Sequence, residues 1–337
     1  MKEGYTFDDV LLVPQYSTVS SRKMVDLQVL LPKNITTSIP VMPANMQDVV
    51  GESSIPIFLQ RGCLSIIHRF NENNEDHQIS FLRRFPDKVD LLGCSIGVKE
   101  QEFDSAKRLI EAGFKVVCID VAHGDSLLVS ELVHKISESY PEILLIAGNV
   151  ATARGAERLW KSGADIVKVG VGPGSICTTR KETGNGYPQL SALMDVNERR
   201  NDLQQELGRQ LSIISDGGIK SAGDCVKALC FSDLVMIGGM FAGTIEAPGK
   251  KLNLNGETYK EYRGSSTLKP SHVEGAVVLK TVSSTLDSVL DRLQEGIRSG
   301  CSYQGCHSVD ALKDNPEFIK VSSVQRDLDH NKETFRG

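Results

Sequence analysis

The chain has 337 residues, of which 24% are charged and 40% are hydrophobic, a balance typical of a protein with a core and not of a disordered chain. Lys and Arg number 38 against 43 Asp and Glu, which gives a net charge of −5, and aromatic residues make up only 6%. Because charges of one sign form no long block, this composition argues against a nucleic-acid partner held by charge or by stacking.

The sequence also argues against a membrane or secreted protein. It contains no run of roughly 18 uninterrupted apolar residues, and its first residues include acids where a signal peptide would be apolar. The eight cysteines are too sparse for a disulfide scaffold and lack His partners at zinc-ligand spacing. We therefore expect a cytoplasmic protein in which most cysteines are reduced, buried thiols.

Short apolar runs recur along the chain with regular spacing. They lie at 39–43, 64–68, 90–94, 116–120, 143–147, 165–169, 211–215 and 233–237. Continuous apolar runs of this length are typical of strands covered on both faces. Segments with helical periodicity lie between them, at 103–110, 127–136, 156–160 and 222–229. Eight strand–helix units predict a (β/α)₈ TIM barrel in one domain spanning 1–337, ahead of a doubly wound sheet.

Two segments interrupt the repeat. Residues 170–189 follow the sixth strand and are too rich in Gly, Pro and Thr to be helical. Residues 238–272 follow the eighth strand and have no clear period, which predicts a long flap, about 244–280, over the barrel mouth. A final amphipathic helix is expected at about 285–297. Because barrel active sites lie in the loops after the strands, functional residues are expected in these two segments.

Glycine pairs follow the seventh and eighth predicted strands. Gly217 and Gly218 come after Asp216, and Gly238 and Gly239 follow the last apolar run. In barrels the loops at these two positions commonly bind a phosphate through backbone N–H groups, which glycine lets approach closely. The alternative is that each pair only turns the chain. Their joint occurrence at both positions favours a phosphorylated substrate.

The loop GVGPGSIC (170–177) begins the first interruption. It follows the sixth strand and lacks an acidic residue about 20 positions on, so it is not a dinucleotide-binding fingerprint. The carbonyls of Gly172, Gly174 and Cys177 could turn inward together, an arrangement that suits K⁺. Cys177 also lies on a polar loop beside Thr178 and Thr179, a setting that favours a thiolate nucleophile. An inert loop thiol is the alternative.

Other polar residues stand at the same predicted end of the barrel. Asp120 and His123 stand at the end of the fourth strand. Asp120 is either a functional carboxylate or a helix N-cap, and His123 is either functional or a structural histidine. Glu274 stands in an otherwise apolar stretch. It is either an exposed turn residue or a carboxylate that reaches the catalytic loop when the flap closes.

Several motifs together resemble the IMP dehydrogenase/GMP reductase family. They are TFDDVLLVP (6–14), PANM (43–46), IDVAHG (119–124), AGNV (147–150), GVGPGSICTTR (170–180), SDGGI (215–219) and MIGGMFAG (236–243). The resemblance runs from about residue 5 to 310. It implies a TIM barrel, usually a homotetramer, that binds GMP or IMP and forms a covalent adduct between a cysteine and C2 of the purine.

The resemblance also assigns roles to residues. It implies a nucleophile, Cys177, with Thr179 and Glu274 as the pair that activates water in dehydrogenases and handles ammonia in reductases. The substrate site would comprise Ser175, Asp216, Gly218, Gly238, Gly239, Tyr262, Gly264 and Ser265, with Asp216 at the ribose. The cofactor site would comprise Asp120, Ala122, Asn149 and Gly170. The carbonyls of Gly172, Gly174 and Cys177 match the K⁺ site.

Three features favour a reductase within this family. Only residues 69–88 separate the second and third strands, where dehydrogenases usually carry a regulatory insert. Residues 267–272 hold no Arg-Tyr pair, which dehydrogenases use as the general base for water, and Gly239 stands where dehydrogenases tend to have serine. We therefore expect an NADPH-dependent GMP reductase. The alternatives are an insert-less IMP dehydrogenase that uses NAD and a nucleotide-binding barrel without catalysis, which the Cys177, Thr179 and Glu274 set argues against.

Overall fold

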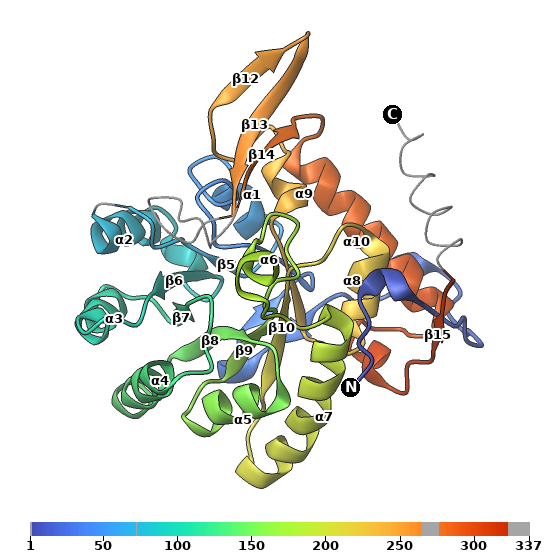
Figure 1. Ribbon diagram of the computed structural model, residues 1–337, viewed down its shortest axis with the longest axis horizontal. Coiled ribbons are helices and arrows are strands. Elements are labelled where there is room, and N and C mark those ends of the chain that lie inside the picture. Colours follow the sequence, from blue (N-terminus) through green and yellow to red (C-terminus); the bar gives the residue numbers. More distant parts are fainter. Residues whose placement is uncertain (1, 72, 265–275, 323–337) are drawn as a thin grey trace.

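Each of the eight apolar runs forms a parallel strand, and together they make a nearly closed barrel (Figure 1). The computed structural model describes residues 2–71, 73–264 and 276–322. The barrel strands are β4 (Val41–Pro43), β5 (Ser65–Ile66), β6 (Leu92–Ile96), β7 (Val116–Asp120), β8 (Leu144–Val150), β9 (Ile166–Val169), β10 (Ser212–Asp216) and β11 (Leu234–Ile237). Since β11 pairs with β4, the ring is complete apart from the seam between β4 and β5. The TIM-barrel prediction is confirmed.

Helices cover the outside of this ring (Figure 1). They are α1 (Ile55–Gln60), α2 (Asn74–Arg84), α3 (Glu102–Glu111), α4 (Leu127–Ser139), α5 (Ala153–Lys161), α7 (Gln189–Leu207), α8 (Ala222–Leu229) and α10 (Leu286–Tyr303). Four of them begin where a Ser or Thr side chain accepts a backbone N–H three residues on, namely at Ser126, Thr152, Ser221 and Thr285. The four helical segments expected between strands are confirmed, and α10 extends beyond the expected end at 297 because Cys301 continues its buried face.

The barrel core explains why the strand runs are apolar without alternation. All five residues of β6 are buried, because one face of the strand points into the barrel and the other packs under helices. Between the strands and the surrounding helices, Trp160 of α5 is fully buried. Burial of a large apolar side chain contributes about 1.5–3 kcal/mol, so the repeated layers hold the strand ends in fixed positions.

Short elements near the chain ends complete the described structure. β1 (Val10–Leu12) pairs with β15 (Phe318–Lys320), and β2 (Val29–Leu30) pairs with β3 (Thr36–Thr37). The 3-10 helices are η1 (Phe7–Asp9), η2 (Arg22–Met24), η3 (Pro32–Asn34), η4 (Pro86–Lys88) and η5 (Asp310–Lys313). The β1–β15 pair therefore joins the two ends of the described chain.

The first interruption is not entirely irregular, which corrects the expectation for 170–189. A short helix, α6 (Thr179–Thr183), follows the cysteine loop and ends at Gly184, whose φ of 71° is left-handed. Arg180, Lys181 and Glu182 are good helix formers, and this local preference prevails over the surrounding Gly and Pro. The helix places its first residue, Thr179, two positions after Cys177.

The second interruption contains regular structure, which the absence of a clear period in the sequence did not predict. After the short α9 (Gly239–Ala242), the strands β12 (Lys251–Leu254), β13 (Glu257–Arg263) and β14 (Val277–Thr281) form an antiparallel sheet, here called the flap sheet, which projects beyond the helices (Figure 1). The sequence signal was Asn255-Gly256, a two-residue hairpin turn with φ of 52° and 85°. Ser265 and Glu274 lie outside the described residues.

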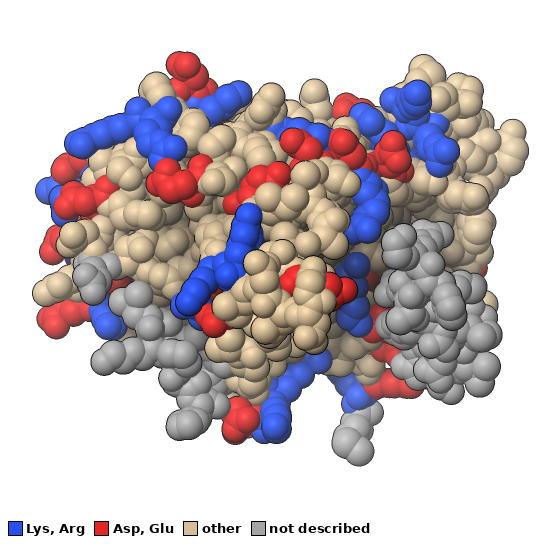
Figure 2. Space-filling model, turned by 90° about the horizontal axis from the view of Figure 1, so that it is seen from above, with Lys and Arg blue, Asp and Glu red and all other residues tan. Residues whose placement is uncertain are grey.

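Charged side chains of both signs are mixed on the surface (Figure 2). In Figure 2, Lys and Arg side chains are interspersed with Asp and Glu over the face shown. Within the described residues, none of the helices has the length and apolar character needed to cross a membrane.

Candidate active site

A cavity of about 550 Å³ opens at the carboxyl ends of the barrel strands, and every predicted site residue within the described part of the chain lines it. These residues are Asp120, Ala122, Asn149, Gly170, Gly172, Gly174, Ser175, Cys177, Thr179, Asp216, Gly218, Gly238, Gly239, Tyr262 and Gly264. Residues separated by up to 144 positions in sequence thus meet at one site, and its volume suits a ligand of nucleotide size.

Cys177 differs from the other cysteines in its exposure. All eight cysteines lie among the described residues and are free, and Cys177 alone is exposed. Burial raises the pKa of Cys63 and of Cys118 to about 12, which keeps these thiols protonated and inert. The Cys177 Sγ lies 3.2 Å from Thr179 Oγ1, to which it donates a hydrogen bond. The expectation of mostly reduced, buried thiols is confirmed, and the accessible thiol faces the cavity.

A buried lysine, which sequence reasoning missed, connects two carboxylates on the cavity floor. The Lys168 Nζ lies 2.5 Å from Asp120 Oδ1 and 3.5 Å from Asp216 Oδ2. Burial alone would lower the pKa of Lys168, but Asp120 and Asp216 raise it above its ordinary value. Lys168 is therefore a fixed cation at the centre of the site.

Asp120 and Asp216 differ in how many of their carboxylate oxygens already have a partner. Burial alone would raise the pKa of Asp120, but Lys168 and the amide of Asn45, 3.0 Å from Oδ2, hold it below its ordinary value. Asp216 Oδ2 also accepts a hydrogen bond from Asn149 Nδ2 at 2.8 Å, and the same amide reaches the Gly170 carbonyl at 2.9 Å. Asp216 Oδ1 accepts no hydrogen bond from any described residue. It is the carboxylate oxygen free to bind a ligand.

The alternatives for Asp120 and His123 are decided differently by the structure. Asp120 is not a helix N-cap, because Ser126 occupies that position before α4. His123 is exposed and lines a second cavity of about 490 Å³, together with Asp125. The second cavity shares Ala122, Val171 and Thr179 with the first, so Thr179 borders both.

The second cavity carries an acidic group that is already paired. Arg158 donates two hydrogen bonds to Asp125, with Nε–Oδ1 and Nη2–Oδ2 distances of 2.7 and 2.6 Å. Arg158 holds the pKa of Asp125 below its ordinary value, so this carboxylate stays ionised next to its cation. The resulting bidentate pair leaves this part of the cavity close to neutral.

The glycine pairs lie where the phosphate hypothesis places them, beside the cavity. Gly217 and Gly218 have φ of 92° and 83°, which favours glycine at both positions. A Cβ on Gly238 would lie 2.3 Å from the hydroxyl oxygen of Tyr262, so a side chain there would displace the tyrosine. Gly238 thus permits the close approach of Tyr262, whereas at Gly217 and Gly218 the left-handed turn of the chain by itself accounts for glycine.

Two contacts fix the flap sheet to the barrel. Lys260 of β13 is buried, and its Nζ donates to the carbonyls of Thr244 and Ile245 at 2.8 and 3.0 Å. The end of β13 is held by the Arg263 N–H, which donates to Asp48 Oδ2 at 2.8 Å. Because Tyr262 lies between these two anchors, its ring is held at the cavity.

The predicted K⁺ ligands are all main-chain carbonyls of one loop. The Gly174 carbonyl accepts the Cys177 N–H at 3.1 Å, which leaves its second lone pair free. Gly172 has a φ of 81°, the left-handed region that glycine adopts readily. K⁺ is commonly coordinated by main-chain carbonyl oxygens, so these three groups fit the predicted ion. Among the described residues, no group of three His, Cys, Asp or Glu side chains could hold a metal instead.

The chain is similar to known proteins along nearly its whole length. The model of the IMP dehydrogenase / GMP reductase domain matches residues 4–330. A GMP reductase of Streptococcus agalactiae serotype III is 37% identical over 327 residues, covering 95% of this chain and 96% of the relative. A GMP reductase of Streptococcus pyogenes serotype M4 is 36% identical with the same coverage. An inosine-5′-monophosphate dehydrogenase of Nitrosopumilus maritimus is 32% identical over a longer alignment of 465 residues.

Proposed function

Since the chain belongs to the IMP dehydrogenase/GMP reductase family, whose members are oxidoreductases acting on purine nucleotides, we propose that it is a GMP reductase. The reaction would convert GMP and NADPH into IMP, ammonia and NADP⁺. The observation that carries the proposal is the exposed Cys177, which lines the first cavity and donates a hydrogen bond to Thr179, a residue that borders both cavities. A nucleophile placed there can face a nucleotide in one cavity and a nicotinamide in the other.

The relatives and the flap sequence favour the reductase over the dehydrogenase. Relatives named GMP reductase align along 96% of their length at 37% identity, whereas the dehydrogenase aligns at 32% with many positions that have no counterpart here. Residues 267–272 read TLKPSH and contain no Arg-Tyr pair to act as a base for water. Without such a base, a covalent adduct would persist long enough to be reduced.

In the proposed mechanism Cys177 forms a covalent bond to the purine. Its thiolate attacks C2 of GMP, the 2-amino group is protonated and leaves as ammonia, and C2 remains bonded to Sγ. Thr179, whose hydroxyl lies 3.2 Å from Sγ, would transfer protons at this step together with Glu274. When bound, NADPH supplies the hydride that takes the place of sulfur at C2, and IMP leaves. The thiolate is thereby regenerated.

The remaining cavity residues would hold and orient the nucleotide. Asp216 Oδ1 is free to accept the ribose hydroxyls, while Lys168 fixes the carboxylate from behind. The phosphate would lie among Ser175, Gly218, Gly238, Gly239 and Tyr262, with Gly264 and Ser265 at the flap side of the substrate. Such fixed positioning makes the attack on C2 effectively intramolecular.

The cofactor and the ion would occupy the remaining predicted positions. NADPH would lie along Asp120, Ala122, Asn149 and Gly170 and extend into the second cavity. Because Arg158 neutralises Asp125 there, the extra phosphate of NADPH meets no uncompensated negative charge. K⁺ would be held by the carbonyls of Gly172, Gly174 and Cys177 and would stabilise the conformation of the cysteine loop.

Two parallel assays in K⁺ buffer test the proposal. One contains GMP with NADPH or NADH, and the other contains IMP with NAD⁺. We expect loss of NADPH absorbance with release of ammonia in the first and no reaction in the second. Formation of NADH and XMP in the second assay would identify an IMP dehydrogenase and refute the argument from the flap.

The quaternary structure is a separate proposal. The family resemblance implies a homotetramer, and light scattering on the purified protein measures its mass directly. A mass of about four chains in solution is expected, and a stable monomer that is fully active would contradict it.

A further inference from the structure

A row of three lysines crosses one face of the flap sheet. Lys251 of β12 lies opposite Lys260 of β13, which in turn lies opposite Lys280 of β14. Like charges directly opposite one another destabilise a sheet unless something compensates them. Lys260 is compensated, because it is buried against the carbonyls of Thr244 and Ile245. The side-chain ammonium of Lys280 makes no hydrogen bond or ion pair with any described residue.

Lys280 faces the first cavity at a gap left by a glycine. Its Nζ lies 3.7 Å from the point that a Cβ on Gly239 would occupy. Ser175 Oγ and the ring carbon Cε1 of Tyr262 each lie 3.6 Å from the same point. A cation, a hydroxyl and a phenol ring therefore converge on one open position from the cysteine loop and from two strands of the flap sheet.

We propose that Lys280 is a direct ligand of the nucleotide phosphate, an inference that rests on the nucleotide site of the proposed function. A free ammonium beside a serine hydroxyl and two glycines is suited to a phosphate dianion, since charge-assisted hydrogen bonds are the short and strong ones. Lys280 lies on β14, whereas Ser175 and Gly239 belong to the barrel loops. The phosphate would thus join the flap sheet to the barrel.

Binding titrations test this proposal with three variants. Lys280→Met keeps the length of the side chain and removes its charge, Lys280→Arg restores a charge, and Lys251→Met is the matched control in the same row. Calorimetry without cofactor compares GMP with guanosine, which lacks the phosphate. We expect Lys280→Met to weaken GMP binding about tenfold or more and to leave guanosine binding unchanged. Lys280→Arg should recover most of the affinity, and Lys251→Met should bind GMP like the unsubstituted protein.

Two outcomes would overturn the proposal. One is unchanged GMP binding in Lys280→Met, and the other is an equal loss for GMP and guanosine, which would indicate a general distortion of the site. Ribose 5-phosphate separates this inference from the proposed reaction, because it carries the phosphate without the purine. If the unsubstituted protein turns over GMP while Lys280→Met binds ribose 5-phosphate equally well, only the role of Lys280 is wrong. If GMP is not converted but ribose 5-phosphate binding depends on Lys280, the phosphate site stands and the reaction does not.

Discussion

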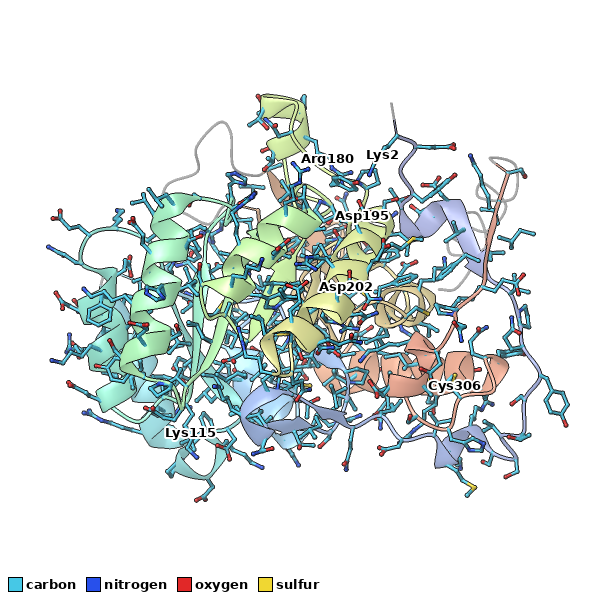
Figure 3. The ribbon with its side chains drawn as sticks, turned by 90° about the horizontal axis from the view of Figure 1, so that it is seen from below. Lys2, Lys115, Arg180, Asp195, Asp202 and Cys306 are labelled. Carbon is cyan, nitrogen blue, oxygen red and sulfur yellow. The ribbon has the colours of Figure 1, made fainter. Side chains whose placement is uncertain are left out.

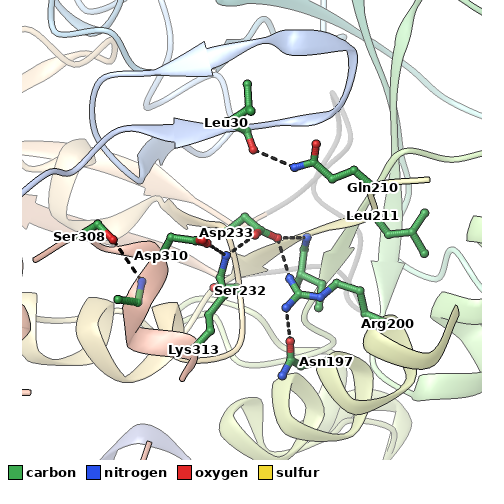
Figure 4. A network of polar contacts seen from close by, with 12 residues as sticks. Leu30, Asn197, Arg200, Gln210, Leu211, Ser232, Asp233, Ser308, Asp310 and Lys313 are labelled. Atoms are coloured by element: carbon green, nitrogen blue, oxygen red, sulfur yellow. Dashed lines mark hydrogen bonds and ion pairs between the residues drawn. The ribbon is translucent and has the colours of Figure 1, made fainter. Parts of the chain in front are cut away.

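The barrel holds a buried cluster of cations and carboxylates at each end, and the two clusters differ in what they leave free. In Figure 3, Lys115, which precedes β7, and Arg180, which follows β9, lie at opposite ends of the barrel. At the amino end, Asp233 precedes β11 and has a partner on each of its carboxylate oxygens (Figure 4). Its Oδ1 lies 2.6 Å from Lys313 Nζ, and its Oδ2 lies 3.0 Å from Arg200 Nη1 and 2.7 Å from the Ile213 nitrogen.

At the carboxyl end the corresponding cluster is incomplete. Lys168 satisfies Asp120 and one oxygen of Asp216, but Asp216 Oδ1 has no partner among the described residues and borders the cavity. The same types of side chain therefore serve two purposes. A closed cluster is costly to disrupt, because removing one partner leaves a buried charge uncompensated, whereas an open cluster of fixed charges is ready to bind a ligand.

The largest expected effect follows from a substitution at the carboxyl end of the barrel and concerns activity alone. Cys177→Ala should lower kcat/KM by at least about 10⁴-fold, because it removes the atom that would bond to C2 in the proposed mechanism. The melting temperature should stay unchanged, since Cys177 is exposed. The measurements are NADPH consumption and thermal unfolding. Cys306→Ala is the control, because this half-buried thiol follows α10 (Figure 3) and should retain full activity. Turnover by Cys177→Ala near that of the control would exclude covalent catalysis.

The next effect should fall on stability alone and comes from the amino end. Asp233→Asn leaves the buried Arg200 without its carboxylate and leaves the half-buried Lys313 with only Asp310, which should cost about 3–5 kcal/mol in the free energy of unfolding. Activity per folded molecule should not change. Urea unfolding measures the loss. Asp310→Asn is the matched control, because Asp310 contacts the same Lys313 at 2.6 Å but is exposed, so its removal should cost little. Equal losses in the two variants would contradict the comparison.

A smaller effect on binding should come from the open carboxylate. Asp216→Asn keeps the shape of the side chain but would weaken the hydrogen bonds proposed between this side chain and the ribose, so kcat/KM for GMP should fall about 10- to 100-fold. Kinetics with 2′-deoxy-GMP and 3′-deoxy-GMP identify the hydroxyl concerned. The penalty for its removal should be large in the unsubstituted protein and should nearly vanish in the variant. A penalty of the same size in both proteins would place the ribose elsewhere.

Most of the barrel and most of the site could be predicted because their signals are local. Strands covered on both faces are continuous apolar runs, and the cysteine loop and glycine pairs are short motifs next to them. The helix at 179–183 and the flap sheet were missed, although Asn255-Gly256 is a local hairpin signal. Composition rich in glycine obscured both elements.

The electrostatic part of the site could not be predicted from local patterns. Lys168 is 48 residues from Asp120 and also 48 residues from Asp216, and only the closed ring of strands brings them together. A lysine inside an apolar strand was the available signal, because burying a charge requires a partner. Lys280 gave no such signal, since its strand is exposed on alternate residues and the register alone turns it toward the cavity.

The smallest expected effect is a difference between the two ends of the barrel in how stability depends on pH. His68 follows β5, stacks on Phe70 of the cavity wall, and has a pKa lowered to about 4 by burial and by His77. Between about pH 6.5 and 4 the unfolded chain binds a proton that the folded protein does not, so stability is full above this window and falls as the pH drops through it. The loss due to His68 should be about 2 kcal/mol at pH 5.

His68→Asn tests this difference, because its amide oxygen can still accept the Phe70 N–H that bonds to His68 Nδ1. Urea unfolding at pH 7 and pH 5 should show a pH dependence that is smaller by about 2 kcal/mol in the variant than in the unsubstituted protein. Substitution of the exposed His307 by Asn should leave the pH dependence unchanged. Arg200 and Lys313 hold the pKa of Asp233 below its ordinary value despite its burial, so the amino-end cluster keeps its stabilisation down to more acidic pH. An equal pH dependence in His68→Asn and the unsubstituted protein would show that the acid-sensitive group lies elsewhere than behind the cavity wall.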